Sequence, residues 1–261
     1  MQRPPSGKGL PLAPASPIHD ALNRISGKQT ELIKLGLSPA RLTALMEFVE
    51  RAFTASALAL TGLDVSDEQI AVLQRGRVQE AEALPGTEGK IQAGLTSVRV
   101  LRSVADRAAA ASLTPELLLR IHDPLNDKPS GNNESDTAAD GAEESARTAA
   151  RIMAFCDWAA ADSFRELNAL EQAAIIVLRL LEIRPFAEGN VIAALGAGSL
   201  FTMRAGWPPI IIPKPIQPRF KPTVGEGMKM NTRPMVDLLA ESIYQTIESI
   251  IQLAKAGADR R

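Results

Sequence analysis

A loop between two strongly apolar segments constrains this chain more than any other feature. Residues 182–190 read Glu-Ile-Arg-Pro-Phe-Ala-Glu-Gly-Asn, and the segments on both sides have helical periodicity. Pro185 ends the first helix because it has no N–H to donate and disfavours helical backbone angles at Arg184. Gly189 and Asn190 tolerate the left-handed backbone that a tight turn requires. The sequence therefore predicts a helix–loop–helix.

The beginning of the second helix is a candidate anion site. The first N–H groups of a helix have no partner within it, and they attract phosphate groups. Glu188 is close enough along the chain to hold a divalent cation that bridges phosphates. A simple connector remains the alternative, because most loops with this Pro–Gly–Asn pattern only join two elements.

The same residues resemble the signature of the Fic family, whose members mostly transfer AMP from ATP to a protein hydroxyl. That signature is His-Pro-Phe-x-(Asp/Glu)-Gly-Asn-Gly-Arg-x-x-Arg. The chain matches it in register at Pro185, Phe186, Glu188, Gly189 and Asn190. After the second helix it has Arg-Ala-Gly-Trp-Pro-Pro, where the family often has Arg-Ala-Gly-Tyr-Pro-Pro. The resemblance covers residues 37–254 and implies an all-α fold, a Fic-type helical bundle with this anion-hole loop at its centre.

The chain departs from the signature where the family does its chemistry. Arg184 replaces the catalytic histidine, a general base, and a guanidinium stays protonated at any working pH. Val191 replaces the glycine that lets the loop approach phosphate. Ile192 replaces the arginine that contacts the nucleotide phosphates, and Leu195 replaces the last arginine. General-base assistance alone is typically worth about two to four orders of magnitude in rate, so the resemblance implies a degenerate active site.

What survives of the signature shapes the loop. The resemblance assigns Gly189 and Asn190 as relic nucleotide-binding residues and Glu188 as a candidate metal ligand. It also implies a relic of an inhibitory helix, in which a Ser/Thr precedes a glutamate by four positions. Ser56 matches the hydroxyl residue and Leu60 stands in place of the glutamate. The alternative is an ordinary buried helix with small residues on one face.

A third family element, the flap hairpin that docks a target peptide, is expected before the helix that starts near residue 142. Residues 126–141 lack an alternating β-branched pattern and have the composition of a solvated, mobile loop. A peptide cannot add as a strand where no ordered edge exists. We therefore expect the docking element to be lost or rebuilt.

The helical period extends along nearly the whole chain, in a single domain over residues 17–257 between a proline-rich tail (1–16) and a short C-terminal tail (258–261). The segment from Pro208 to Pro222 is expected to be an extended connector. Helices are expected near residues 17–34, 38–60, 66–75, 88–110, 114–122, 142–161, 167–183, 189–204 and 232–256.

Composition narrows the function. A net charge of −1 and a pI near 6.2 argue against nucleic acid as a partner. The single cysteine, Cys156, allows no internal disulfide, and we expect it to be buried and inert. Two histidines, His19 and His122, are too few for a metal cluster, and we assign His122 a capping or surface role. No secretory signal or membrane span is evident, so we expect a cytoplasmic protein without membrane contact.

Three interpretations remain open. The first is a non-catalytic Fic-fold pseudoenzyme that needs no cofactor and acts by binding an unknown protein partner or as a homodimer. The second is a residual or altered nucleotidyltransferase that uses ATP and Mg²⁺ through Glu188 and Asn190. The third is a helical domain whose loop resemblance carries no shared function.

Overall fold

The computed structural model describes residues 17–76, 87–105, 112–122 and 138–256. In these ranges every regular element is a helix, which confirms the predicted all-α class. None of the described helices is long and apolar enough to cross a membrane. The helices are α1 Pro17–Lys34, α2 Pro39–Ala59, α3 Asp67–Gln74, α4 Glu88–Ala105, α5 Pro115–His122, α6 Ala138–Ala159, α7 Asp162–Arg165, α8 Ala169–Ile183, α9 Asn190–Arg204, α10 Gln217–Gly227 and α11 Arg233–Ala256.

Local capping explains where several helices begin. At α3 the Ser66 hydroxyl accepts from the backbone N–H of Gln69, whose side chain accepts from the backbone N–H of Ser66. Asn168 and Glu171 form the same reciprocal pair at α8. Each pair satisfies N–H groups that the helix itself leaves without partners. Helices α2 and α5 each begin at a proline, Pro39 and Pro115, within one residue of the predicted starts at 38 and 114.

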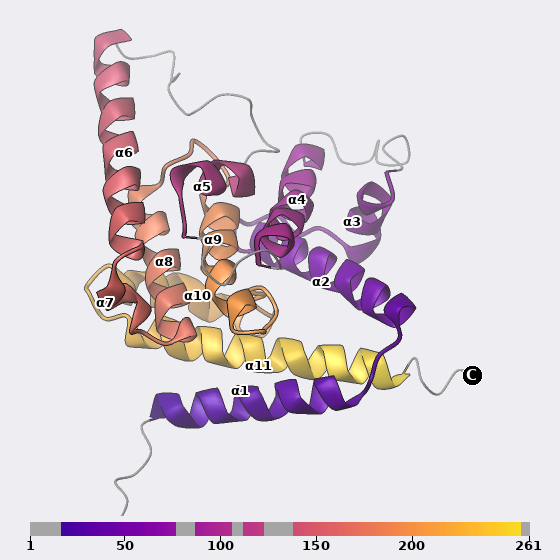
Figure 1. Ribbon diagram of the computed structural model, residues 1–261. Coiled ribbons are helices and arrows are strands. Elements are labelled where there is room, and N and C mark those ends of the chain that lie inside the picture. Colours follow the sequence, from indigo (N-terminus) through magenta and orange to yellow (C-terminus); the bar gives the residue numbers. More distant parts are fainter. Residues whose placement is uncertain (1–16, 77–86, 106–111, 123–137, 257–261) are drawn as a thin grey trace, which may run out of the picture.

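Helix α9 is the centre of the molecule (Figure 1), and residues 192–202 are buried throughout. It packs most extensively on α8, and also on α4, α5 and α2. Two glycines permit this close approach. A Cβ atom at Gly196 would lie 2.6 Å from Ile121 of α5, and one at Gly198 would lie 2.7 Å from Val177 of α8. The helix–loop–helix α8–α9 therefore occupies the core, as the sequence predicts.

Helices α1 and α11 lie side by side along one edge of the bundle (Figure 1). The ammonium of Lys28 lies 3.3 Å from Glu248, and that of Lys255 lies 2.9 Å from Glu31. Such surface ion pairs contribute little free energy. The apolar face of α11, including Leu238 and Ile243, is buried and supplies the main attachment.

The connector predicted from Pro208 to Pro222 is wrong in its second half. Residues 208–216 have no helix, but α10 then begins at Gln217 and continues through Pro222. Pro218 lies in the first turn, where a missing N–H costs no hydrogen bond. Pro222 removes one N–H further on, and the helix tolerates the loss.

Helix α6 begins at Ala138, earlier than the predicted start at 142. The last residues of the predicted mobile loop, 138–141, therefore belong to a helix, and alanine is the best helix former. The rest of that loop, residues 126–137, lies outside the described residues. The four-residue α7 was not predicted, because one turn has no detectable period. The single-domain assignment stays a prediction.

Candidate functional site

The loop begins with a left-handed residue. Helix α8 ends at Ile183, and Arg184 follows with φ 50° and ψ 62°, its N–H donating to the carbonyl of Leu180 at 2.9 Å. This left-handed backbone is unfavourable for a residue with a Cβ, by about 1–2 kcal/mol. Gly189, with φ 73°, makes the second left-handed turn at no such cost. Arg184, at the position of the family histidine, has an exposed side chain at the end of α8.

Asn190 closes the loop with both ends of its side-chain amide. Its Nδ2 donates to the carbonyl oxygen of Phe186 at 2.6 Å, and its Oδ1 accepts from the Phe186 N–H at 3.0 Å. Asn190, a predicted nucleotide-binding residue, therefore has a structural role in which it binds the backbone of Phe186. A nucleotide or a metal would have to displace these hydrogen bonds to reach the amide.

His122, at the end of α5, holds the loop from the other side. Its Nε2 lies 2.9 Å from the carbonyl oxygen of Glu188, and its ring stacks on Phe186 with centroids 3.5 Å apart and planes 6° from parallel. A carbonyl only accepts, so Nε2 carries the proton in this contact. The predicted surface position of His122 is wrong: the side chain is buried against the loop. Only the folded arrangement of α5 against the loop reveals this contact.

Glu188 is the exposed carboxylate of the loop. Its side chain is 64% exposed, and the ammonium of Lys90 on α4 lies 3.0 Å from its Oε2. Across the described ranges, no three His, Cys, Asp or Glu side chains gather where they could hold a metal ion. A divalent cation would therefore compete with Lys90 for a single carboxylate, whereas Mg²⁺ and Ca²⁺ need several oxygen ligands.

The residues that replace the family glycine and arginines belong to the core. Ile192 and Leu195 are buried, and Val191 is partly buried against the same core. An arginine at position 192 or 195 would have to place its charge among apolar side chains, which costs free energy unless the charge is paired. The N-terminus of α9 has no side-chain cap, so its backbone N–H groups could receive an anion. The first turns of α9 contain no arginine that could bind such an anion as well. The described residues therefore fit a nucleotide poorly.

Ser56 and Leu60, the suggested inhibitory relic, have structural contacts. The Ser56 hydroxyl donates to the carbonyl oxygen of Ile212 at 3.1 Å and accepts from its N–H at 2.8 Å. Leu60 packs partly buried against the core. These contacts attach residues 208–216 to α2. Within the described part of the chain no hydrogen bond or ion pair joins either residue to the loop.

Comparisons with known proteins show what the chain is similar to. No protein-family model matches the chain. It is 28% identical to the protein adenylyltransferase fic-1 of Caenorhabditis elegans over 103 residues, 40% of this chain and 20% of that protein. It is 28% identical to the protein adenylyltransferase Fic of Drosophila willistoni over 97 residues, 37% of this chain and 20% of that protein. The match thus spans about a fifth of the length of these relatives.

Solved structures extend the similarity to nearly the whole chain. A fragment of Fic-1 from C. elegans superposes with a TM-score of 0.68 at 18% identity, covering 90% of this chain and 71% of the fragment. A Fic domain containing signaling protein from Bacteroides thetaiotaomicron gives a TM-score of 0.70 at 16% identity, covering 92% and 98%. The chain has the Fic fold. This fold, with the sequence similarity to Fic adenylyltransferases over about two fifths of the chain, confirms the predicted Fic-type helical bundle.

Proposed function

We propose that this Fic-fold chain is a pseudoenzyme, a binding or regulatory protein whose anion-hole loop now joins α5, α8 and α9 structurally. The observation that carries the proposal is the burial of Ile192 and Leu195 at the positions of the family arginines. A phosphate at the start of α9 would meet no guanidinium from that helix. The two hydrogen bonds that Asn190 makes to Phe186 support the same conclusion, because they occupy its amide.

The loss of the imidazole base from the loop supports loss of catalysis. Arg184 cannot accept a proton at working pH. His122 is the one imidazole that the described residues place against the loop, and its Nε2 is engaged as a donor to the Glu188 carbonyl. Neither side chain is arranged to take a proton from a target hydroxyl.

The alternative is a residual nucleotide-dependent transferase that uses Glu188 and Asn190 with Mg²⁺. Two observations favour it: Glu188 is exposed, and no side chain caps the N-terminus of α9. Both leave room for an anion and a cation to approach together. The competition from Lys90 at 3.0 Å makes such a site weak.

Calorimetric titration with ATP and Mg²⁺ separates the two functions. Each lost charge-assisted contact to phosphate weakens binding by about 1.5–3 kcal/mol, so we expect no measurable heat or a dissociation constant on the order of millimolar. Saturable micromolar binding would overturn the proposal if Glu188→Ala abolishes it. Glu182→Ala, at an exposed carboxylate of α8, is the matched control.

Transfer of labelled AMP to added proteins is the second test. We expect no labelled band with the natural chain. A band that disappears in Glu188→Ala and persists in Glu182→Ala would establish the alternative. Three substitutions restore most of the signature: Arg184→His, Val191→Gly and Ile192→Arg. We expect them to lower the stability of the protein, whether or not transfer returns, because residue 192 is buried.

A further inference from the structure

The guanidinium of Arg204, in the last turn of α9, is a charge without a counter-ion. Its Nε and Nη2 atoms are buried and have no hydrogen-bond partner, and it forms no ion pair within the described ranges. Arg179 and Arg219 differ, because they lie 2.7 Å from Glu182 and 2.6 Å from Glu241. Burial lowers the pKa of Arg204, but a guanidinium stays protonated at any working pH.

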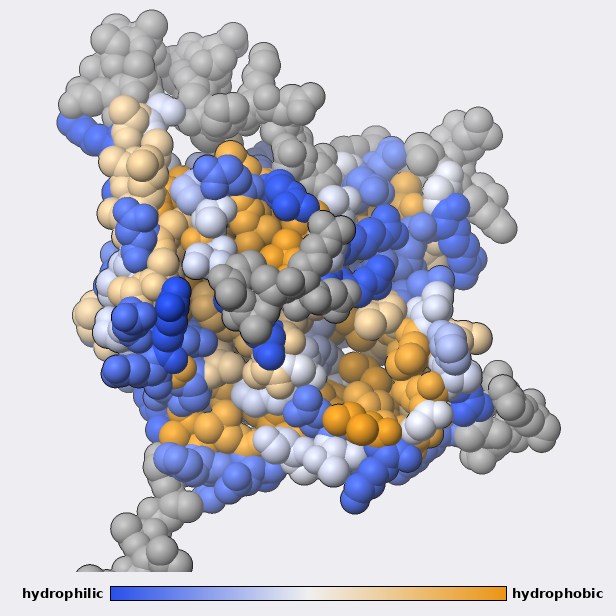
Figure 2. Space-filling view, viewed as in Figure 1, coloured by the Kyte–Doolittle hydropathy of each residue, from blue (hydrophilic) through white to orange (hydrophobic). Residues whose placement is uncertain are grey.

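Buried aromatic rings lie on one side of this charge. The guanidinium carbon lies 5.5 Å from the ring centroid of Phe201, which packs edge-on against Phe164 with centroids 5.6 Å apart. Helix α1 is close by, since the Gln29 side chain donates to the carbonyl oxygen of Gly206 at 3.0 Å. The outer surface along α1 is mostly hydrophilic, and apolar residues lie above it (Figure 2). A buried cation without a partner costs free energy that an anion would recover.

The two unsatisfied nitrogens form one edge of the guanidinium. Their N–H groups point the same way from the planar group, and this fork matches the two oxygens of a carboxylate. An arginine that only complements the negative end of a helix dipole donates to the last carbonyl groups or is solvated. Nε and Nη2 of Arg204 do neither, so this edge fits a ligand with two acceptor oxygens.

The charge balance favours a carboxylate over a phosphate. One guanidinium neutralises the single charge of a carboxylate, whereas a phosphate group carries about −1.5 to −2 at neutral pH. The C-terminal end of α9 adds a partial negative charge of roughly −0.5, which repels a second negative charge. Burial alone lowers the pKa of Arg204, so no second cation among the described residues acts on it.

We propose that Arg204 anchors a carboxylate-binding site, and that its side chain turns the fork outwards to bind the acid. The residue is only partly buried and ends its helix, so the side chain has room to rotate. The contact with the Phe201 ring is weak and is exchanged for a bidentate ion pair. An acidic side chain of a protein and a free small acid share this chemistry. The proposal is independent of whether the loop binds nucleotide.

NMR of the arginine Nε–H groups tests the site in the full chain. The Arg204 signal is the one that disappears in Arg204→Met. Sodium acetate should shift it saturably, with a dissociation constant on the order of millimolar, and sodium chloride at equal ionic strength should not. Inorganic phosphate should shift it less than acetate does. The Arg179 signal is the internal control and should stay in place, because that guanidinium is already paired with Glu182.

Capped amino acids distinguish a protein side chain from a free acid. N-acetyl-glutamate amide has its one carboxylate on the side chain, and N-acetyl-glutamine amide is the neutral control. A shift with the glutamate derivative and none with the glutamine derivative assigns the site to an acidic side chain, which is the result we expect. A shift with acetate alone assigns it to a small free acid.

Two variants separate the fork from its charge. Acetate should raise the urea midpoint of the natural chain, and Arg204→Lys, which keeps the charge without the fork, should lose that rise. Arg204→Met should unfold without acetate at a urea concentration no lower than the natural chain, because it removes an unpaired buried charge. Three results would overturn the proposal: an Arg204 signal that acetate shifts no more than chloride or phosphate does, a Lys variant that keeps the rise, or a clearly lower midpoint in Arg204→Met.

Discussion

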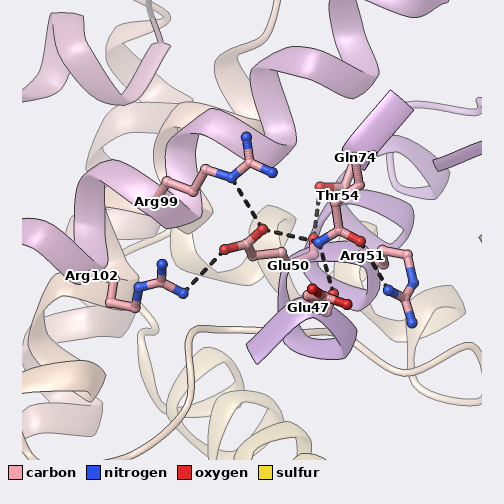
Figure 3. Close-up of polar contacts among 7 residues, drawn as sticks. All are labelled: Glu47, Glu50, Arg51, Thr54, Gln74, Arg99 and Arg102. Carbon is pink, nitrogen blue, oxygen red and sulfur yellow. Dashed lines mark hydrogen bonds and ion pairs between the residues drawn. The ribbon is translucent and has the colours of Figure 1, made fainter. Parts of the chain in front are cut away.

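Two polar regions of this molecule both attach α4 to neighbouring segments, one to the loop and one to α2, but they do so in opposite ways. In the loop, Lys90 of α4 reaches the exposed carboxylate of Glu188. At the other region, Glu50 of α2 is buried, and its carboxylate accepts from Arg99, Arg102 and Gln74 (Figure 3). The charge in the loop is solvated and singly paired, whereas the charge at Glu50 is buried and surrounded by donors.

The difference shows where polar chemistry still contributes to this fold. The loop is held mainly by the buried ring of Phe186 and by hydrogen bonds to its backbone from Asn190 and to the loop from His122. We expect removal of its charged side chains to change the free energy of unfolding little. At Glu50 the charge itself holds three helices together. Truncating an aromatic ring should therefore damage the loop, and removing a carboxylate should damage the other region.

The largest effect is expected at Phe186. Phe186→Ala removes a buried ring that stacks on His122, and should lower the free energy of unfolding by about 3 kcal/mol. Urea denaturation followed by circular dichroism measures this change. Phe186→Leu keeps most of the apolar volume and should lose clearly less. An equal loss in both variants would mean that the stack on His122, and not burial, holds the loop.

Glu50→Ala is expected to be next in size. Its removal leaves Arg99 and Arg102 facing each other without a carboxylate, and should cost about 2 kcal/mol. Both arginines are partly exposed, so water compensates part of the loss. Glu47→Ala, one turn earlier on the same helix and exposed, should change stability by less than about 0.5 kcal/mol. If the two variants behave alike, the contrast between buried and solvated charge fails.

Local chemistry was predictable from the sequence. Pro185 and Gly189 indicate the turn between α8 and α9, because each acts on backbone within a few residues. Contacts between distant segments were not. Glu50 has the appearance of an ordinary charged residue on an amphipathic helix, and nothing near it in sequence announces Arg99 or Arg102.

The same limit applies to His122 and to α10. His122 reaches the loop only because α5 packs against α9, so its role depends on the assembled bundle. The prolines of α10 suggested an extended chain, since proline disfavours helix interiors. One of them lies in the first turn, where it is tolerated, and the packing of Phe220 into the core stabilises the rest. Tertiary packing outweighed local preference there.

Asn190→Ala tests how much the loop depends on backbone hydrogen bonds. It removes both contacts to Phe186 and should lower the free energy of unfolding by about 1–2 kcal/mol. Thermal and urea denaturation measure the loss. Asn231→Ala is the control, because that exposed amide makes one long contact, 3.4 Å to Glu226. No loss at Asn190 would show that the aromatic stack alone fixes the loop.

The smallest effect, and the only gain in stability, is expected at Arg184. Its left-handed backbone is unfavourable for a residue with a Cβ, and its side chain is exposed, so glycine should fit the position better. Arg184→Gly should therefore raise the free energy of unfolding by about 0.5–1 kcal/mol. Arg179→Gly, at an ordinary helical position of α8, should instead lower it by about 1 kcal/mol. Arg184→His keeps the Cβ strain and should leave stability nearly unchanged. If Arg184→Gly destabilises the protein, the guanidinium makes a contact worth more than the backbone strain, and the loop then depends on charge as the Glu50 region does.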